Sequence, residues 1–341
     1  MIRLIATPEL PARRNLALTE ALLHGDDEIF RLQRFRPGAL VGAHQALGRE
    51  VDLPWCAEHG VEVARRMTGG GAIIMDPGIL GWELILRRDR FPAGLAAAGA
   101  SLCRAIAGGL AGLGLPATFR PRNDIVVDGR KLAGTGGYFD RDRLLFQGTV
   151  LVDPDFALMT RALRLPERKL SAGGDFAARL TSLRAEGVRL RFDEIGAGLA
   201  TALAAALGAK LIPSTLHDGE AARAAALHDA EIGTEAFVHG HHLHQHPAAA
   251  DRHARRASPA GIAEAVLRAQ AGRIQAIAIG GDFFITPPRV LRDLEAVLTG
   301  RRLDEAEAVA RGFLATSGAS IAGAGLDLLA DVIAEAACAS A

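Results

Sequence analysis

The chain has 341 residues, and 39 Lys and Arg residues balance 39 Asp and Glu residues. This balance argues against a general nucleic-acid-binding protein, which normally carries a basic excess. The length suits about two domains. Three cysteines without a CxxC pair exclude a disulfide scaffold and a thiolate zinc site, and they are typical of a reducing compartment.

Apolar residues make up 49% of the chain, as in a globular protein. The apolar stretches are rich in Ala and Gly and are interrupted, so we expect no membrane association. Pro8 and Pro11 break the first fourteen residues, where a signal peptide needs a continuous apolar core. We therefore expect a mature cytoplasmic protein.

The first two thirds of the chain mix helices and strands without a regular βαβ alternation. Apolar periodicity and turn residues set the boundaries, and Asp128-Gly129 is a strong hairpin signal. Helices are expected at 15–24, 52–59, 93–113 and 192–207, and strands at 29–36, 40–43, 61–67, 72–75, 80–86, 125–127, 131–138 and 144–152. This order predicts an α+β fold.

A break follows near residues 208–235, where glycines and a proline surround one Ala-rich helix. The tail then has its own strand and helix signals. Strands are expected at 262–269 and 274–279, and helices at 288–298, 304–314 and 326–337. We expect two domains, residues 1–225 and residues 232–341.

A glycine-rich segment, Arg65–Ala72, lies between two expected strands. Three consecutive glycines allow backbone N–H groups to approach an anionic or planar ligand. The arginines Arg65 and Arg66 could neutralise a carboxylate or a phosphate. The alternative is a flexible hinge with two surface arginines. The spacing fits neither a GxGxxG nor a GxxxxGK[ST] motif.

A lysine-containing hairpin is the second signal. Lys131 follows the Asp128-Gly129 turn and stands three residues before Gly134, so its ammonium could stabilise negative charge on a phosphate or acyl oxygen. The alternative is a solvated hairpin lysine. The next strand carries Gln147-Gly148-Thr149, which is a weak signal by itself.

In this order and spacing the motifs resemble one family, the lipoate–protein ligases, on the biotin/lipoate protein ligase fold. The segments that carry the resemblance are Asn15–Glu20, Arg65–Ala72, Asn123–Asp124 with Gly129–Gly134, Gln147–Thr149 and Arg179–Leu183. The segments 272–284 and 294–300 resemble the family's accessory C-terminal domain. The resemblance therefore covers nearly the whole chain.

The resemblance implies a fold and a reaction. The fold is α+β, with a mixed or antiparallel sheet and flanking helices in the catalytic domain and a small α+β accessory domain. The enzyme uses ATP and Mg²⁺ to convert lipoate or octanoate into an acyl-adenylate. It then transfers the acyl group to a lysine of a lipoyl carrier, which is an E2 domain, a glycine-cleavage H-type protein or a lipoate-binding protein.

The resemblance also implies site residues. Lys131 is the expected catalytic residue, in contact with the mixed anhydride. Mg²⁺ is expected to arrive with ATP near Asp124, with no metal held by the protein alone. The residues expected to bind the substrate or the adenylate are Arg66, Thr68, Gly69, Gly70, Gly71, Ala72, Asp76, Asn123, Asp124, Gly134, Thr135, Gln147 and Gly148.

Some positions depart from the family pattern. Met75 and Gln147 stand where the family often has histidine, and Phe35 stands where tryptophan is common. These departures point to a divergent branch, with similarity to ligases that serve lipoate-binding proteins of sulfur oxidation. The carrier, the preference between lipoate and octanoate, and the oligomeric state do not follow from the sequence.

Two alternative functional hypotheses stay open. The first is an octanoyl or lipoyl transferase on the same fold, which would use an activated cysteine. The segment 119–124 before Lys131 contains none, and Cys56 and Cys103 are expected to be small core residues. The second is a non-catalytic protein that binds the carrier or the ligand. The His239–His246 cluster is interpreted as a surface loop, with metal binding as the alternative.

Overall fold

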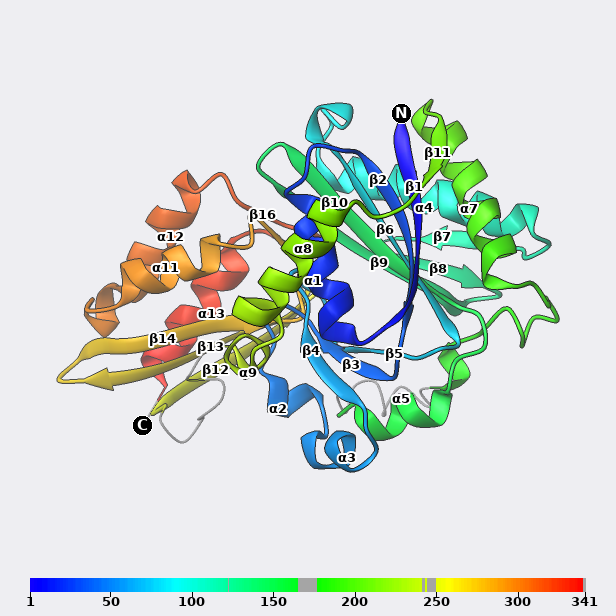
Figure 1. Cartoon of the computed structure of the whole chain (residues 1–341). Helices are drawn as coiled ribbons and strands as arrows, with labels where there is room; N and C mark the ends of the chain where they lie inside the picture. Colours follow the sequence, from blue (N-terminus) through cyan, green and yellow to red (C-terminus); the bar gives the residue numbers. More distant parts are fainter. Residues whose placement is uncertain (122, 165–176, 241–242, 244–249, 340–341) are drawn as a thin grey trace. The chain divides into compact units, whose positions relative to one another are not determined.

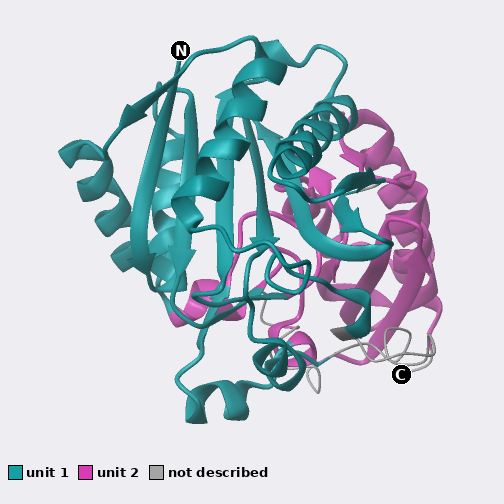
Figure 2. Ribbon diagram, turned by 90° about the vertical axis from the view of Figure 1, so that its right-hand side faces the viewer, with its two compact units in different colours: residues 1–40, 51–64, 73–234 teal, residues 41–50, 65–72, 235–341 magenta. Residues whose placement is uncertain are grey.

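The computed structural model describes residues 1–121, 123–164, 177–240, 243 and 250–339. The chain divides into two compact units, shown in teal and magenta in Figure 2. Unit 1 consists of residues 1–40, 51–64 and 73–234, and unit 2 consists of residues 41–50, 65–72 and 235–341. The chain therefore enters unit 2 twice before its C-terminal third, and one of these two segments carries the glycine run.

Unit 1 is built on an eight-stranded sheet with the order β11-β1-β2-β6-β10-β9-β8-β7 (Figure 1). β1 pairs in parallel with β11 and β2, and the pairs from β2 to β7 are antiparallel, which makes the sheet mixed. The strands are β1 (Ile2–Leu10), β2 (Ile29–Phe35), β6 (Ile79–Arg87), β7 (Thr118–Arg120), β8 (Asp124–Val127), β9 (Arg130–Asp140), β10 (Arg143–Leu151) and β11 (Leu211–Ser214).

A second sheet has the order β4-β3-β5, and the glycine run connects β4 to β5. The strands are β3 (Gly38–Val41), β4 (Glu62–Arg65) and β5 (Ile73–Met75). The helices of unit 1 are α1 (Ala12–Leu23), α3 (Leu53–Glu58), α4 (Leu95–Gly112), α5 (Phe156–Ala162), α7 (Phe192–Leu207) and α8 (Asp218–Leu227), with the short turns η1 (Arg88–Arg90), η2 (Ala177–Arg179) and η3 (His228–Ile232).

The main core lies between one face of the large sheet and helices α4 and α7. Alternate residues of β6, including Trp82 and Leu84, point into this core and belong to the same buried cluster as Leu102 and Ile106 of α4. Among the described helices α4 has the length and apolarity of a membrane span, by composition alone. Its apolar side chains are used in the core against the sheet and α7.

The opposite face of the sheet carries a buried ion pair. Arg31 of β2 donates to the Glu83 carboxylate at 2.6 Å, and both side chains are fully buried. Two residues of α1 complete the network, because Thr19 Oγ1 donates to Glu83 at 2.8 Å and the Asn15 carbonyl accepts from Arg31 at 3.1 Å. A buried pair is tolerated when its remaining polar atoms are also bonded. The opening helix of the family resemblance is thus a structural partner of this pair.

Unit 2 has its own core between a three-stranded antiparallel sheet, in the order β12-β13-β14, and helices α11 and α13. A two-stranded sheet, β15-β16, completes it. The elements are α2 (Leu47–Glu50), α9 (Glu235–His239), β12 (Arg252–Ser258), β13 (Gly261–Gln270), β14 (Arg273–Gly281), β15 (Ile285–Thr286), α11 (Val290–Leu298), η5 (Leu303–Glu305), α12 (Ala306–Thr316), β16 (Ser320–Ile321) and α13 (Asp327–Cys338).

The α+β class and the paired hairpin of β8 and β9 confirm the sequence-based expectation. Six of the described strands were not predicted: β1, β7, β11, β12, β15 and β16. The side chains of β12 are half-buried or exposed. That exposure explains why no apolar alternation marks this edge strand.

Candidate active site

The glycine segment between β4 and β5 belongs to unit 2, and the Arg66 side chain holds its backbone. The buried Arg66 guanidinium donates to the carbonyls of Gly69 at 3.2 Å and Gly71 at 2.9 Å. Burial first, and the neighbouring Arg65 second, lower the pKa of Arg66 to about 10, so the group stays charged at neutral pH. Thr68, also buried, lies 3.4 Å from Arg66 Nε through its hydroxyl oxygen.

The glycines of this segment serve two purposes. A Cβ at Gly69 would lie 2.2 Å from the Phe283 carbonyl oxygen, and a Cβ at Gly70 would lie 2.6 Å from the Phe284 ring. Gly70 also has a φ of +88° and donates its N–H to the Phe283 carbonyl at 3.2 Å. Gly71 is different, because a Cβ there would meet nothing within 4 Å. Packing inside unit 2 therefore requires the first two glycines, and Gly71 with Ala72 forms the more open part.

The sequence left open whether Arg65 contacts a ligand or lies on the surface, and the structure places it in the framework of unit 2. Its guanidinium donates to five backbone carbonyls, those of Gly42, Ala43, Gln45, Val238 and His239. Burial lowers its pKa to about 10. Arg65 thus ties the segment after β3 to α9 and holds the base of the glycine segment.

Lys131 lies on β9 of unit 1 in an ion pair with Asp124 of β8. Its Nζ is 2.7 Å from Asp124 Oδ1, and Arg120 donates to the other carboxylate oxygen at 2.8 Å. Burial alone would raise the pKa of Asp124, but the two cations more than offset burial and hold it below its ordinary value. About a third of the Lys131 side chain is exposed, so the ammonium is fixed and still accessible.

The strand face around Lys131 is kept free of bulky side chains. Gly134 pairs with Asp124 on one side and with Thr149 on the other, and Gly136 pairs with Gln147. Directly opposite residues of a sheet share a face, so these partly exposed positions form one open row beside the ammonium. This row can accept an extended ligand against the sheet.

The segment after η2 supports the Lys131 backbone. Leu180 forms a bridge with Lys131, and the Thr181 N–H donates to the Lys131 carbonyl at 2.9 Å. Leu183 continues along β10 by donating to Leu151 at 2.9 Å. The loop Arg179–Leu183, one of the segments that carry the family resemblance, therefore holds the hairpin of Lys131 in place.

Three of the residues expected to bind the ligand have structural partners within unit 1. The buried Asp76 carboxylate accepts from the backbone of Gly78 at 2.6 Å and Asp155 at 3.0 Å, and burial raises its pKa. A Cβ at Gly148 would collide with the Trp82 ring at 2.5 Å, so packing requires that glycine. Thr135 points into the core, where its hydroxyl lies 3.2 Å from Cys103 Sγ.

The expected Mg²⁺ position near Asp124 does not fit the residues present. Its Oδ1 is paired with the Lys131 ammonium and its Oδ2 with the Arg120 guanidinium. A divalent cation needs free carboxylate oxygens, and both are engaged by cations here. We therefore assign Asp124 to the positioning of Lys131 and not to metal binding.

Elsewhere in the described residues, Asp27, His217 and Glu220 bring ligand-type atoms within 4.8 Å of one another. The Arg3 guanidinium is bonded to both carboxylates, at 2.9 Å to Asp27 and 2.5 Å to Glu220. This cluster is accounted for as an ion-pair network. Of the histidine cluster, only His239 falls within the described residues; it lies 3.7 Å from Glu235.

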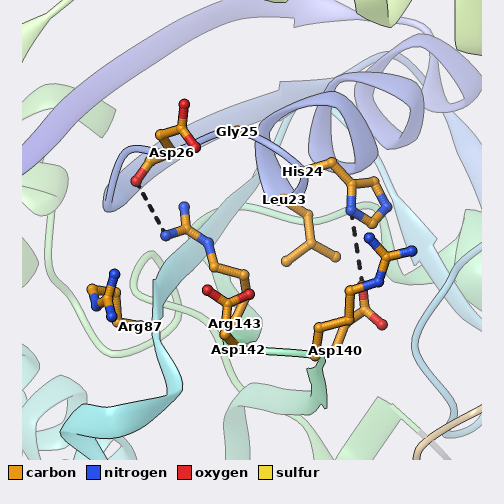
Figure 3. Close-up of a pocket in the computed structure, with 9 residues that line it drawn as sticks. Leu23, His24, Gly25, Asp26, Arg87, Asp140, Asp142 and Arg143 are labelled. Atoms are coloured by element: carbon orange, nitrogen blue, oxygen red, sulfur yellow. Dashed lines mark hydrogen bonds and ion pairs between the residues drawn. The ribbon is translucent and has the colours of Figure 1, made fainter.

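A polar pocket with a volume of about 410 Å³ lies at the end of β9 remote from Lys131. Figure 3 shows the residues that line it. Its lining comes from the end of α1, the end of β6 and the turn between β9 and β10, and it includes none of the residues expected to bind substrate. Arg143 donates to the Asp26 carbonyl at 3.2 Å, and His24 lies 3.9 Å from Asp140.

The structure brings Lys131, Asp124, Asn123, Gly134 and Gln147 together in unit 1, and it gathers Arg66, Thr68 and the three glycines in unit 2. Sequence reasoning missed Arg120 and Thr181, which hold Asp124 and Lys131, and it also missed the buried Arg31–Glu83 pair of the large sheet. The charged residues inside the apolar strands β2 and β6 were the available signal for that pair.

The lipoyl protein ligase A/B catalytic domain family matches residues 11–204. The octanoyltransferase LipM of Symbiobacterium thermophilum is 30% identical over 68% of this chain and 96% of its own length. A probable lipoate–protein ligase A of Mycoplasma pneumoniae is 32% identical, over 40% of this chain and 39% of its own length.

Solved structures give the same relationship. A bipartite lipoate–protein ligase from Thermoplasma acidophilum, solved in a study that includes its E2 lipoyl domain, is 26% identical over 70% of this chain and 96% of its own, with a TM-score of 0.63. A lipoate–protein ligase A bound with ATP is 25% identical over 70% of this chain and 98% of its own, with a TM-score of 0.62. The structure of P. falciparum LipL1 is similar in fold, with a TM-score of 0.74. The match covers 93% of this chain and 94% of the LipL1 chain at 16% sequence identity.

Proposed function

Because the chain belongs to the lipoyl protein ligase A/B family, we propose that it is an ATP-dependent lipoate–protein ligase. The enzyme joins the lipoate carboxylate to the α-phosphate of ATP and releases pyrophosphate. It then passes the lipoyl group from the acyl-adenylate to a lysine of a lipoyl carrier domain, and AMP leaves. The similarity to an ATP-bound ligase and to a ligase studied with its E2 lipoyl domain supports the proposal.

The observation that carries the proposal is the placement of the three cysteines. Cys103 is buried on the core side of β9, and burial raises the pKa of its thiol. Cys56 is buried in α3, with its pKa also raised by burial, and Cys338 lies exposed at the end of α13 in unit 2. Acyl transfer through cysteine needs a thiolate at the reacting centre. Within unit 1, which carries Lys131, both cysteines are buried, and neither Cys56 nor Cys103 offers such a thiolate.

In this proposal Lys131 supplies fixed positive charge. Both steps build negative charge near one acyl-phosphate centre, first at the phosphorus and then at the carbonyl oxygen. A preorganised ammonium can stabilise both without reorganising solvent. The pairing with Asp124 at 2.7 Å directs the ammonium, which serves in this proposal as an electrostatic group and not as a general base.

The glycine segment binds the acyl-adenylate in the same proposal. Arg66 fixes the segment by its bonds to the Gly69 and Gly71 carbonyls, and Gly71 and Ala72 provide the open backbone. A backbone without a Cβ allows close approach of a planar or anionic group. The rigid arginine fork preserves that shape before the ligand arrives.

Octanoyl transfer from an acyl-carrier protein is the second candidate. The similarity to the octanoyltransferase LipM, which extends over 96% of that protein, favours it. The two functions differ in whether a nucleotide is consumed and in whether a cysteine is acylated.

The test uses the purified full chain with a lipoyl carrier domain and measures the carrier by intact mass. One arm supplies lipoate, ATP and MgCl₂ and also records pyrophosphate, and the other supplies octanoyl-acyl-carrier protein without nucleotide. We expect a lipoyl adduct and pyrophosphate in equal amounts in the first arm only. A carrier modified as fast in the second arm would overturn the ligase proposal and establish the transferase.

A further inference from the structure

The hairpin of β8 and β9 contains a bulge beside Lys131. Val126 pairs with Lys131 and Ile125 pairs with Ala133, so Leu132 is the extra residue on β9. In a regular strand, residues three apart point to opposite faces. The extra residue shifts this alternation and places Lys131 on the same face as Gly134, where its Nζ lies 2.9 Å from the position of a Gly134 Cβ.

The strands are locked together immediately after the bulge by Thr135 and Asn123. The Thr135 N–H donates to the Asn123 carbonyl at 2.9 Å, and the Thr135 hydroxyl donates to the same carbonyl at 3.1 Å. The Asn123 side-chain amide returns a bond to the Thr135 carbonyl at 2.8 Å. Asn123 directly precedes Asp124, the partner of Lys131, so these three bonds fix the backbone that presents the ion pair.

The hydroxyl of Thr135 acts from the core side of the sheet. The side chain is 6% exposed, and Cys103 of α4 is 1% exposed and lies 3.2 Å from it through Sγ. When the hydroxyl donates its one hydrogen to the Asn123 carbonyl, the Cys103 thiol is left as the donor of the contact with Thr135. A chain of hydrogen bonds therefore runs from α4 through Thr135 to the residue before Asp124.

We propose that Thr135 is a positioning residue, which acts through Asn123 to hold Lys131 and Asp124 on the open face of the sheet. This inference rests on one part of the proposed function, namely that Lys131 takes part in the acyl-transfer reaction. Thr135 itself does not touch the substrate, since its side chain lies on the opposite face. A hydroxyl that matters only for stability would affect folding but leave the rate per folded molecule unchanged.

The test compares Thr135→Val, which keeps the shape and removes the hydroxyl, with Thr135→Ser, which restores it. Thr7→Val is the matched control, because Thr7 of β1 is similarly buried and its hydroxyl donates to the Leu32 carbonyl at 3.2 Å, remote from the hairpin in sequence and in the sheet order. Turnover, KM for lipoate and thermal melting are measured for each full-length variant.

We expect Thr135→Val to lose about tenfold to a hundredfold in kcat with KM for lipoate nearly unchanged, since small displacements of a catalytic group have effects of this size. Thr135→Ser should recover to within about threefold of wild type, and Thr7→Val should keep wild-type kcat. Hydrogen exchange of the backbone amide at position 135 should be faster in Thr135→Val than in wild type. Wild-type kcat in Thr135→Val, or a serine variant as slow as the valine variant, would overturn the proposal.

If Thr135→Val does not fold, Asn123→Asp tests the same clamp, because it removes the donor to the Thr135 carbonyl and keeps the shape. It should lower kcat while sparing KM, and an unchanged kcat would contradict the proposal. If the wild type proves to transfer octanoyl groups without ATP, the same comparison is made on that reaction. The role of Thr135 can therefore be tested even if the ligase assignment is wrong.

Discussion

Gly134 leaves the space that the end of the Lys131 side chain occupies. A Cβ at Gly134 would lie 2.9 Å from Lys131 Nζ and 3.0 Å from its Cε. The absence of a side chain at Gly134 therefore allows the Lys131 ammonium to reach its position beside Asp124. This is a second role for the glycine, in addition to leaving room for a ligand.

Gly134→Ala should move the ammonium and slow ligation. The new methyl group meets the far end of a flexible side chain, so Lys131 can shift at little cost in stability while its geometry is lost. We expect at least about a tenfold fall in kcat with a melting temperature close to wild type. Gly108→Ala in α4, where a Cβ meets nothing within 4 Å, is the control and should keep full activity. Unchanged kcat in Gly134→Ala would show that the position of the ammonium is not critical.

The two signatures were visible in the sequence because they depend on local chemistry. A glycine run between strands, and a lysine after a turn, can be recognised from residue type and spacing alone. The partners of Lys131 could not be found in this way, because Thr181 lies 50 residues later and its backbone makes the contact. β1 and β11 were missed for a similar reason, since each is stabilised by a partner that is distant in sequence.

Arg66→Ala should weaken use of lipoate because the carbonyls of Gly69 and Gly71 lose their common donor. Leaving buried carbonyls without a partner costs about 1–3 kcal/mol each, so the segment should relax and KM for lipoate should rise. Arg66→Lys should restore little, because a single ammonium does not reproduce the planar fork. The measurement is steady-state ligation with varied lipoate, alongside melting. A lysine variant with wild-type KM would contradict the clamp.

The double variant Cys56→Ser, Cys103→Ser should keep its chemistry. Both thiols are buried, and a serine at position 103 can still donate to Thr135. Some loss of stability is expected from placing hydroxyls in apolar surroundings. Single-turnover lipoylation per folded molecule is the readout, and a folded double variant without turnover would reveal a nucleophilic cysteine.

Glu295 should make unit 2 sensitive to pH. Burial raises its pKa to about 7, although the Ile279 N–H and Arg292 partly offset the effect. Unfolded, the carboxyl ionises near 4.5, so the folded state binds the proton more tightly and stability falls as pH rises from about 4.5 to 7.

Glu295→Gln should remove this slope and stabilise the protein at pH 8 relative to wild type, by no more than about 3 kcal/mol. The amide oxygen can still accept from Ile279, which donates to Glu295 at 2.7 Å. Chemical denaturation of both proteins at pH 4.5 and pH 8 measures the difference. A difference that does not change with pH would show that Glu295 has an ordinary pKa in the folded protein.

The central claim is that Lys131 stabilises the negative charge that forms during acyl activation and transfer. Losing one preorganised donor of this kind typically costs about 10²–10³ in rate. Single-turnover lipoylation by Lys131→Ala, measured beside its thermal melting, is the most direct test. We expect a normal melting temperature with a loss of that size or more, and Lys131→Arg should also be poor. A Lys131→Ala protein that melts normally and lipoylates within about threefold of wild type, a loss of only about 0.7 kcal/mol, would contradict the claim.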